Sequence, residues 1–219
     1  MSLELKKRII TSIFLLILLS LMYYYSFILI IASIIIGLIS WIEFYALISK
    51  IFKKNNFKNR ILRFLYKASS LLYLSGLVIF VILAKMINLD LYLVIIYSLL
   101  IAIMSDVGGL IIGKWFKGKK LTKISPNKTI SGSIGSFIFS LVLIPFFITY
   151  FETYSIFTII LITIIISLTS QLGDLLISYL KRKAKVKNTS DLLPGHGGIL
   201  DRIDGIIFAI PAGLLLFCI

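Results

Sequence analysis

Residues 154–177, YSIFTIILITIIISLTSQLGDLLI, form an apolar run whose amide and charged side chains, Gln171 and Asp174, lie toward its end. A helix rises about 1.5 Å per residue, so a run of this length can cross the roughly 30 Å hydrocarbon core of a bilayer. Gln171, Gly173 and Asp174 place polar groups at one end of it. An acid beside a long apolar segment is unfavourable in a bilayer and is a functional candidate by default. The stretch predicts a membrane-spanning helix with functional polar residues at one end.

The whole chain has the composition of a membrane protein. Its 219 residues are 59% hydrophobic, with a mean hydropathy of +1.06, whereas soluble domains are about half apolar. We expect an all-α, polytopic integral membrane protein with about seven transmembrane helices. The expected spans are 9–25, 28–48, 68–87, 90–105, 132–150, 154–177 and 203–219. We also expect one membrane-embedded domain over 1–219, with scaffold helices in 1–90 and catalytic helices and cytoplasmic loops in 91–219.

The net charge of +14 reflects topology. If the seven expected spans cross the membrane one after another, 22 of the 23 Lys and Arg residues lie on the same side as the N-terminus. Only Lys85 lies on the other side. Cytoplasmic loops are enriched in Lys and Arg, so the N-terminus is expected in the cytoplasm and a nucleic-acid partner is not expected. The basic loop 49–67 also carries aromatic residues and is expected to rest on the membrane surface. The single cysteine, Cys218, excludes an internal disulfide.

Acids and cations follow the apolar run closely. If residues 174–181 are helical, Asp174, Ser178 and Lys181 share one face. Asp201 and Asp204, three residues apart, do the same on the next predicted helix. Carboxylate oxygens suit Mg²⁺, which binds one or two carboxylates together with waters and substrate phosphates. The spacing predicts a magnesium site that handles phosphates.

A glycine-rich turn, PGHGG at 194–198, lies between these groups. Gly197 and Gly198 precede a predicted helix start, where backbone N–H groups and the helix dipole favour an anion. His196, the only histidine, is expected to donate a hydrogen bond to a phosphate or to fix the turn, and a role as a base is less favoured. The alternative is that the turn merely joins two helices, and that Lys183, Lys185 and Lys187 are ordinary cytoplasmic lysines.

A second polar group lies where the predicted span 90–105 ends. Asp106 is followed by Gly108, Gly109 and Gly113, which allow either close helix packing or a broken helix facing a cavity. The segment 123–129, KISPNKT, has cations, hydroxyls and amides suited to phosphates, but not the glycine pattern of a P-loop. Near the inner end of the predicted second span, Glu43 is a candidate for either a structural role, paired with a cation, or a catalytic one.

These motifs resemble a known family. SYLKR at 178–182, PGHGG at 194–198 and DRID at 201–204 are similar to the signature of the phosphatidate cytidylyltransferase (CDP-diacylglycerol synthase) family. SPNKT at 125–129 is similar to the family's Ser-Pro-x-Lys-Thr stretch. The chain departs from the family pattern at Ile177, Asn188 and Ser131, where many members have polar, acidic or aromatic residues.

The resemblance implies a nucleotidyltransferase of phospholipid biosynthesis that transfers the cytidylyl group of CTP to phosphatidate, giving CDP-diacylglycerol and diphosphate. It implies Mg²⁺, with K⁺ as a candidate second cation. The implied metal ligands are Asp174, Asp201 and Asp204. The implied catalytic residues are Lys181, Arg202, Asp106 and His196. The implied substrate-binding residues are Ser125, Lys128, Thr129, Ser178, Arg182, Gly197 and Gly198.

The same resemblance implies a multi-pass protein of the bacterial inner membrane, with its active site facing the cytoplasm, and is compatible with a homodimer. Three alternatives stay open. A CDP-alcohol phosphotransferase shares only the start of its motif with Asp201-x-x-Asp204-Gly205. A CTP-dependent lipid-alcohol kinase would leave only a phosphate on its product. A small membrane transporter would also place acids and glycines in its helices.

Overall fold

The computed structural model describes residues 3–54, 56–122 and 124–217, and Lys123 and Cys218 lie outside these ranges. The chain forms two compact units. The first unit comprises Met1–Leu89 and Leu180–Ile203, and the second comprises Asp90–Tyr179 and Asp204–Ile219. Within the described ranges, β pairing is limited to isolated bridges, so the prediction of an all-α fold is confirmed.

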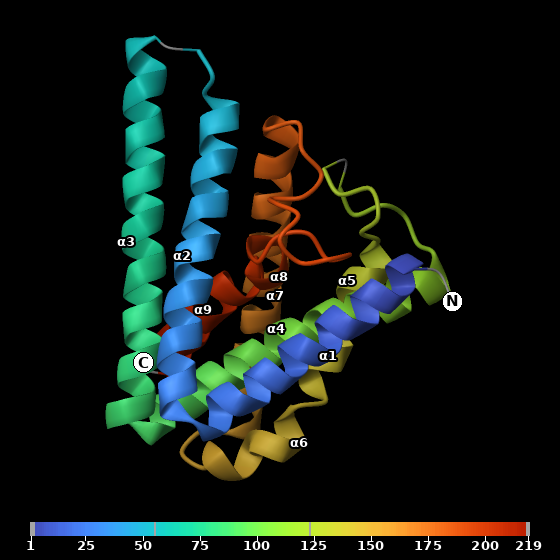
Figure 1. Cartoon of the computed structure of the whole chain (residues 1–219). Coiled ribbons are helices and arrows are strands. Elements are labelled where there is room, and N and C mark those ends of the chain that lie inside the picture. Colours follow the sequence, from blue (N-terminus) through green and yellow to red (C-terminus); the bar gives the residue numbers. More distant parts are fainter. Residues whose placement is uncertain (1–2, 55, 123, 218–219) are drawn as a thin grey trace. The chain divides into compact units, whose positions relative to one another are not determined.

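The first unit is built on three long helices, α1 (Leu3–Tyr24), α2 (Ser26–Ile51) and α3 (Phe57–Ile87), with a short helix α8 (Leu200–Ile203) against α2. Helices α2 and α3 run side by side in opposite directions (Figure 1). Gly37 allows their close approach, because a Cβ atom there would lie 2.8 Å from Val78. Residues 180–203 therefore pack in the same unit as the helices that the sequence assigned to the scaffold.

Helix α3 begins earlier than the sequence suggested. Its 31 residues run unbroken from Phe57 and correspond to about 46 Å, longer than the hydrocarbon core. The basic residues from Lys58 to Lys67 thus lie in the first turns of this long helix, and not in a separate surface helix. Lys67 lies 3.2 Å from the centre of the Tyr45 ring, and its carbonyl accepts a hydrogen bond from Trp41 Nε1.

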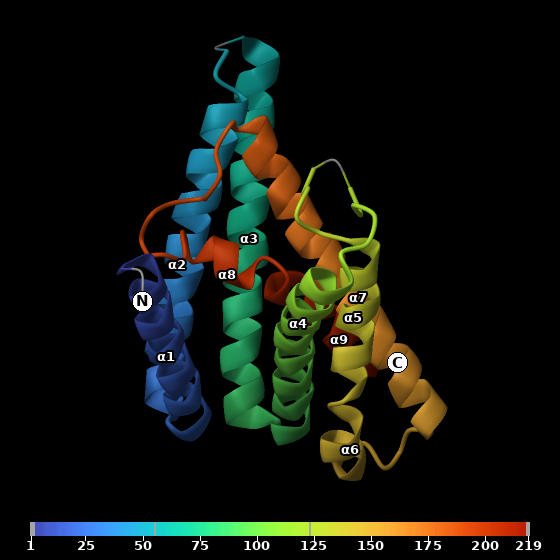
Figure 2. The same ribbon diagram turned by 90° about the vertical axis from the view of Figure 1, so that its right-hand side faces the viewer.

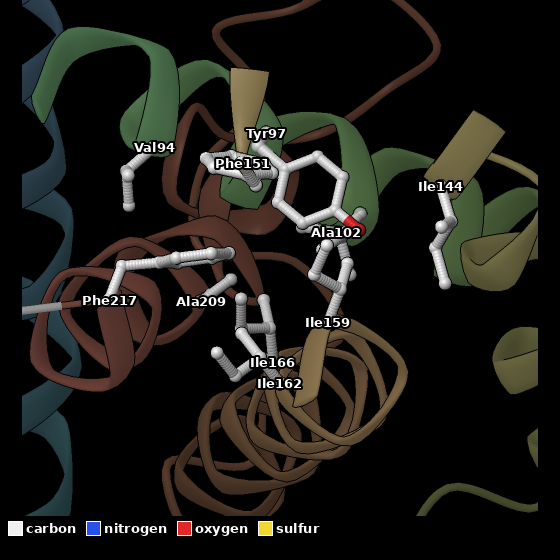
Figure 3. Packing of buried hydrophobic residues seen from close by; sticks show 11 residues of the cluster. Val94, Tyr97, Ala102, Ile144, Phe151, Ile159, Ile162, Ile166, Ala209 and Phe217 are labelled. Atoms are coloured by element: carbon white, nitrogen blue, oxygen red, sulfur yellow. The ribbon is translucent and has the colours of Figure 1, made fainter. Parts of the chain in front are cut away.

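The second unit contains α4 (Leu89–Phe116), α5 (Ile130–Leu141), α6 (Ile144–Phe147), a 3₁₀ turn η1 (Ile148–Tyr150), most of α7 (Ile156–Lys183) and α9 (Ile206–Phe217). Its core is shown in Figure 3. Tyr97 is fully buried there among Phe151, Phe217 and aliphatic side chains. Its hydroxyl shares a 2.6 Å hydrogen bond with Thr163 Oγ1, which satisfies both buried groups.

Helices α4 and α5 pack very closely. A Cβ atom on Gly108 would lie 2.5 Å from the carbonyl oxygen of Gly135, and one on Gly132 would lie 2.8 Å from that of Gly109. Small residues let helix backbones approach in this way. Helix α4 is continuous to Phe116. Of the two arrangements that the glycines allow, the structure therefore has close helix packing and not a broken helix.

The chain is a multi-pass membrane protein by the length and composition of its helices. Five segments of the described chain are long and apolar enough to span a bilayer: Ser26–Ile51, Phe57–Ile87, Leu89–Phe116, Ile130–Tyr150 and Ile156–Lys183. They overlap the five central predicted spans. The first and last predicted spans correspond to shorter apolar helices, Ile9–Tyr24 within α1 and the 12-residue α9. The total of seven crossings stays a prediction.

Candidate functional site

The glycine-rich turn has a defined backbone geometry. His196 N donates to Leu193 O at 2.9 Å, and Gly195 between them has a φ of 78°. Proline followed by a residue with positive φ is the signature of a type II turn. Leu193 and Gly197 then form a short antiparallel bridge. The turn is part of the connection that leads from the end of α7 to α8 in Figure 2. The Pro-Gly sequence is therefore explained by the turn itself.

The N-terminus of α8 is occupied by two carboxylates of the protein. Gly198 N donates to Asp201 Oδ2 at 3.0 Å, so Asp201 reaches back over the first turn as in a capping box. Ile199 N and Leu200 N donate to Glu43 Oε1 and Oε2 of α2 at 3.1 and 2.9 Å. Helix N-termini leave such amides without intrahelical partners. In this structure the acceptors at these amides are the carboxylates of Glu43 and Asp201, and phosphate binding by Gly197 and Gly198 stays a prediction.

Asp201 accepts hydrogen bonds on both of its carboxylate oxygens. Its Oδ1 accepts from Lys181 Nζ at 2.6 Å, and its Oδ2 accepts from the amides of Thr189 and Gly198 and from the Thr189 hydroxyl. The side chains of Lys181 and Asp201 are only 12% and 4% exposed. Burial alone would raise the pKa of Asp201, but the hydrogen bonds from Lys181, Thr189 and Gly198 outweigh it, and the pKa lies below its ordinary value.

Thr189 connects the two carboxylates. Its Oγ1 lies 2.7 Å from Glu43 Oε2 and 3.0 Å from Asp201 Oδ2. A hydroxyl has one proton, so it donates to one of them at a time. Gly198 completes this packing, because a Cβ atom there would overlap the Thr189 hydroxyl and the Glu43 carboxylate. Gly198 is therefore required here for its small size.

Helix α1 also contacts the turn. Thr11 Oγ1 lies 2.8 Å from Lys7 O and 3.0 Å from Pro194 O and donates to one of them at a time. Ser12 Oγ lies 3.4 Å from His196 Nε2. Thr11 is buried. His196 thus lies in the turn with Ser12 as a hydroxyl neighbour, and its expected role in fixing the turn or donating to a phosphate stays a prediction.

In the second unit, Asp174 is surrounded by predicted substrate-binding residues. Lys128 Nζ forms an ion pair with Asp174 Oδ2, and Ser178 Oγ donates to Asp174 Oδ1 at 3.2 Å. Helix α7 covers both Asp174 and Ser178, so the predicted helix is confirmed. Asp204 belongs to the same region, because a Cβ atom on Gly173 would lie 2.8 Å from the Asp204 carbonyl oxygen.

The loop between α4 and α5 brings Lys128 to this position. It is closed by a bridge between Lys120 and Thr129 and is the green and yellow loop in Figure 2. Thr129 caps α5, since its Oγ1 accepts from Gly132 N at 3.0 Å. Ser125 lies in the turn, where its carbonyl accepts from Lys128 N. An open hollow of about 360 Å³ in this loop is lined by Lys120, Leu121, Thr122 and Pro126.

The other predicted site residues lie at the surface. Asp106 on α4 is exposed, as are Arg182 at the end of α7 and Arg202 on α8. Each unit contains its own group of contacting site residues. Lys181 and Asp201 are in contact in the first unit, and Asp174 contacts Lys128 and Ser178 in the second.

The donor chemistry fits a hard cation. Within each unit, the described side chains include no group of three or more His, Cys, Asp or Glu arranged to hold a metal. Mg²⁺ commonly uses only one or two carboxylates and takes its other ligands from water and phosphate. Asp174 is one such carboxylate in the second unit, and Asp204 approaches Gly173 through its backbone carbonyl while its Oδ1 accepts from Gly205 N; their joint role as metal ligands stays a prediction. Asp201 lies in the first unit, where it organises the loop, and its predicted role as a metal ligand stays a prediction.

The partners of Glu43 differ from the cation that its sequence context suggests. The structure gives Glu43 hydroxyl and amide donors from residues 189–200. The acid beside apolar residues was a usable signal for Glu43 itself. Thr189 and Ser190 carried no signal, because hydroxyls in a polar loop are ordinary.

Comparison with known proteins agrees with these features. The chain is 44% identical over 120 residues to the phosphatidate cytidylyltransferase of Staphylococcus haemolyticus (strain JCSC1435), and 45% identical over 120 residues to that of Staphylococcus aureus (strain COL). Each alignment covers 53% of this chain and 46% of the relative, so the match spans about half the length of these relatives. The profile of the cytidylyltransferase family matches residues 3–219. The chain belongs to the cytidylyltransferase family.

Proposed function

We propose that this protein transfers the cytidylyl group of CTP to phosphatidate, forming CDP-diacylglycerol and diphosphate in phospholipid biosynthesis. The observation that carries the proposal is the family match over residues 3–219, together with relatives named phosphatidate cytidylyltransferase. The grouping of Asp174 with Lys128 and of Asp201 with Lys181 supports it, because carboxylates and ammonium groups are what a reaction between two phosphate compounds needs.

In the proposed reaction, a phosphate oxygen of phosphatidate attacks the α-phosphorus of CTP. The new P–O bond forms as the bond from the α-phosphorus to the oxygen bridging to the β-phosphorus breaks, and that electron pair leaves with diphosphate. The attacking oxygen is already ionised, so no strong base is needed, and positioning and charge neutralisation dominate catalysis. This chemistry does not require His196 to act as a base.

Asp174 and Asp204 are proposed to hold Mg²⁺ in the second unit. When bound, the ion would neutralise and orient phosphate oxygens. Lys128 pairs with Asp174 in the structure, which keeps an ammonium beside the proposed metal position. Ser178 donates to the same carboxylate and fixes its orientation. Lys128 is therefore proposed to contact a phosphate when substrate is present.

Lys181 in the first unit is proposed to neutralise charge on the transferred phosphoryl group or on diphosphate. Asp201 holds its ammonium at 2.6 Å and limits its motion. Arg182 and Arg202 are exposed on the solvent side from which a polyanion would arrive. The proposed site faces the cytoplasm of a bacterium, where CTP is dissolved, while the acyl chains of phosphatidate remain in the bilayer.

Product identity tests the proposal. Purified protein would be given phosphatidate, Mg²⁺ and CTP labelled either at the α- or at the γ-phosphate. Cytidylyl transfer places only the α label in lipid. A lipid kinase, tested with diacylglycerol, places only the γ label in lipid. Absence of label in lipid, with ion flux in proteoliposomes lacking CTP, would instead support a transporter and contradict the proposal.

A further inference from the structure

Glu43 has an unusual set of partners for an acid on a long apolar helix. It is 4% exposed, and its carboxylate accepts four hydrogen bonds. Oε1 accepts from Ser190 Oγ at 2.6 Å and from Ile199 N at 3.1 Å. Oε2 accepts from Thr189 Oγ1 at 2.7 Å and from Leu200 N at 2.9 Å. Each oxygen thus has two donors within reach, the ordinary capacity of an ionised carboxylate, and one of these donors, the Thr189 hydroxyl, is shared with Asp201.

These donors come from the two ends of one loop. Thr189 and Ser190 begin it, and Ile199 and Leu200 end it at the start of α8. The carboxylate of Glu43 therefore closes the loop 189–200 and joins it to α2. Hydrogen bonds to an ionised acceptor are stronger than those between neutral groups. A buried carboxylate that lost them would be strongly unfavourable, so the loop and Glu43 stabilise each other.

The loop in turn determines where Asp201 lies. Asp201 Oδ2 accepts from Thr189 N at 2.8 Å and from Gly198 N at 3.0 Å, both within the segment that Glu43 closes. Asp201 Oδ1 then receives Lys181. A continuous chain of hydrogen bonds leads from Glu43 through Thr189 to Asp201 and Lys181.

We infer that Glu43 is a positioning residue, which closes the loop 189–200 and thereby holds Asp201 and Lys181 in place for phosphoryl chemistry. Its catalytic consequence rests on the proposed function, whereas its effect on the loop does not. Glu43 does not contact substrate in this role. Its acceptor positions are filled, and a Cβ atom on Gly198 would already overlap it, so the space beside it is taken.

A spin label on the loop measures the first part of this inference. Leu192 is exposed, and a nitroxide would be attached at Leu192→Cys in a Cys218→Ser background. Glu43→Gln keeps the shape of the side chain but replaces one acceptor oxygen with an NH₂ donor. We expect a more mobile label in Glu43→Gln and an unchanged label in the matched control Glu152→Gln, an exposed acid in the turn before α7. Equal spectra in both variants would overturn the inference.

Smaller changes separate loop closure from general misfolding. Ser190→Ala removes one of the four donors without altering α2, and should mobilise the label to an intermediate degree. Thr189→Val removes the shared hydroxyl, while Thr189→Ser keeps it. Thr189→Ser should therefore resemble the parent protein and Thr189→Val should resemble Glu43→Gln. Equal mobility of the label in Thr189→Ser and Thr189→Val would contradict a role for the hydroxyl.

Activity tests the second part. Displacement of a catalytic group by about 1 Å can reduce a rate about 100-fold, so Glu43→Gln should lower the rate of CDP-lipid formation by at least about tenfold. Combined with Asp201→Asn, it should cause little additional loss, because both act on the same group. A mobile label with full activity would overturn the positioning role. If the parent protein makes no CDP-lipid, the proposed function fails, while the label spectra still decide whether Glu43 closes the loop.

Discussion

At the scale of single residues, the buried Lys181–Asp201 ion pair is the feature of the site expected to tolerate substitution least. Both side chains are largely buried, and their charged atoms are 2.6 Å apart. Removing one partner of a buried pair leaves an uncompensated charge and typically costs about 3–5 kcal/mol. Asp201 also receives the donors of the loop, so its loss affects more than the ion pair.

We predict that Asp201→Asn lowers the thermal unfolding midpoint markedly, because it leaves the Lys181 ammonium without its anion. Lys181→Met should restore part of that loss when added to Asp201→Asn, since the buried cation is then gone. Thermal unfolding of the four proteins of this cycle in detergent measures the coupling. Asp191→Asn, at an exposed position, is the control and should change little. Strictly additive effects would contradict the pairing.

The pKa of Asp201 predicts how stability depends on pH. The pKa in the folded protein lies below the ordinary value of 3.8, so the ionised group stabilises the fold fully above that value. The contribution is lost as the pH falls through the lower, folded-state pKa. The difference in unfolding midpoint between the parent and Asp201→Asn should therefore be constant between about pH 5 and 7 and shrink below about pH 4. A difference that grows toward acid pH would contradict this assignment.

The sequence indicated candidate site residues but not which groups they contact. Asp174, Lys181 and Asp201 stood out because charges beside apolar runs are rare and because they lie in family motifs. Their pairing with Lys128 and with the loop depends on how distant segments fold back, and no local pattern encodes that. Helical spacing predicted the Ser178–Asp174 contact correctly, because both residues lie on α7.

At the scale of helices, the packing of α4 against α5 is the feature most sensitive to size. We predict that Gly108→Ala destabilises the protein, because the added Cβ would lie 2.5 Å from the backbone oxygen of Gly135, which cannot move without shifting α5. Overpacking of this kind typically costs about 1–3 kcal/mol. Gly76→Ala is a matched control in α3, where an added Cβ meets nothing within 4 Å. Comparison of the two unfolding midpoints checks the prediction, and equal midpoints would contradict it.

The five central spans were predictable because a long apolar run indicates a membrane-spanning helix, in which backbone groups are paired within the segment. Helix ends were less predictable. The sequence placed the start of the third span at Ala68, but α3 extends back to Phe57, because basic residues are compatible with a helix that continues beyond the bilayer. The four-residue α8 depends on distant Glu43 for its N-terminal acceptors, and this contact could not be seen in the local sequence.

At the scale of the whole molecule, the distribution of cations predicts topology. We expect a cysteine at Lys54, in the basic turn before α3, to be protected in intact cells from a membrane-impermeant maleimide and to react after permeabilisation. A cysteine at Ser155, in the turn before α7, should react in intact cells. Both would be made in a Cys218→Ser background, with reactivity in detergent as the control for accessibility. The opposite pattern would contradict a cytoplasmic N-terminus.

The most direct test of the central claim is CDP-lipid synthesis by this chain of 219 residues. The purified protein would be assayed with CTP, phosphatidate and Mg²⁺, beside Asp174→Asn and the exposed control Asp191→Asn. We predict CDP-diacylglycerol from the parent and from Asp191→Asn, and a loss of at least about 100-fold in Asp174→Asn, a size typical of lost transition-state electrostatics. No CDP-diacylglycerol from the parent protein, or full activity in Asp174→Asn, would contradict the account.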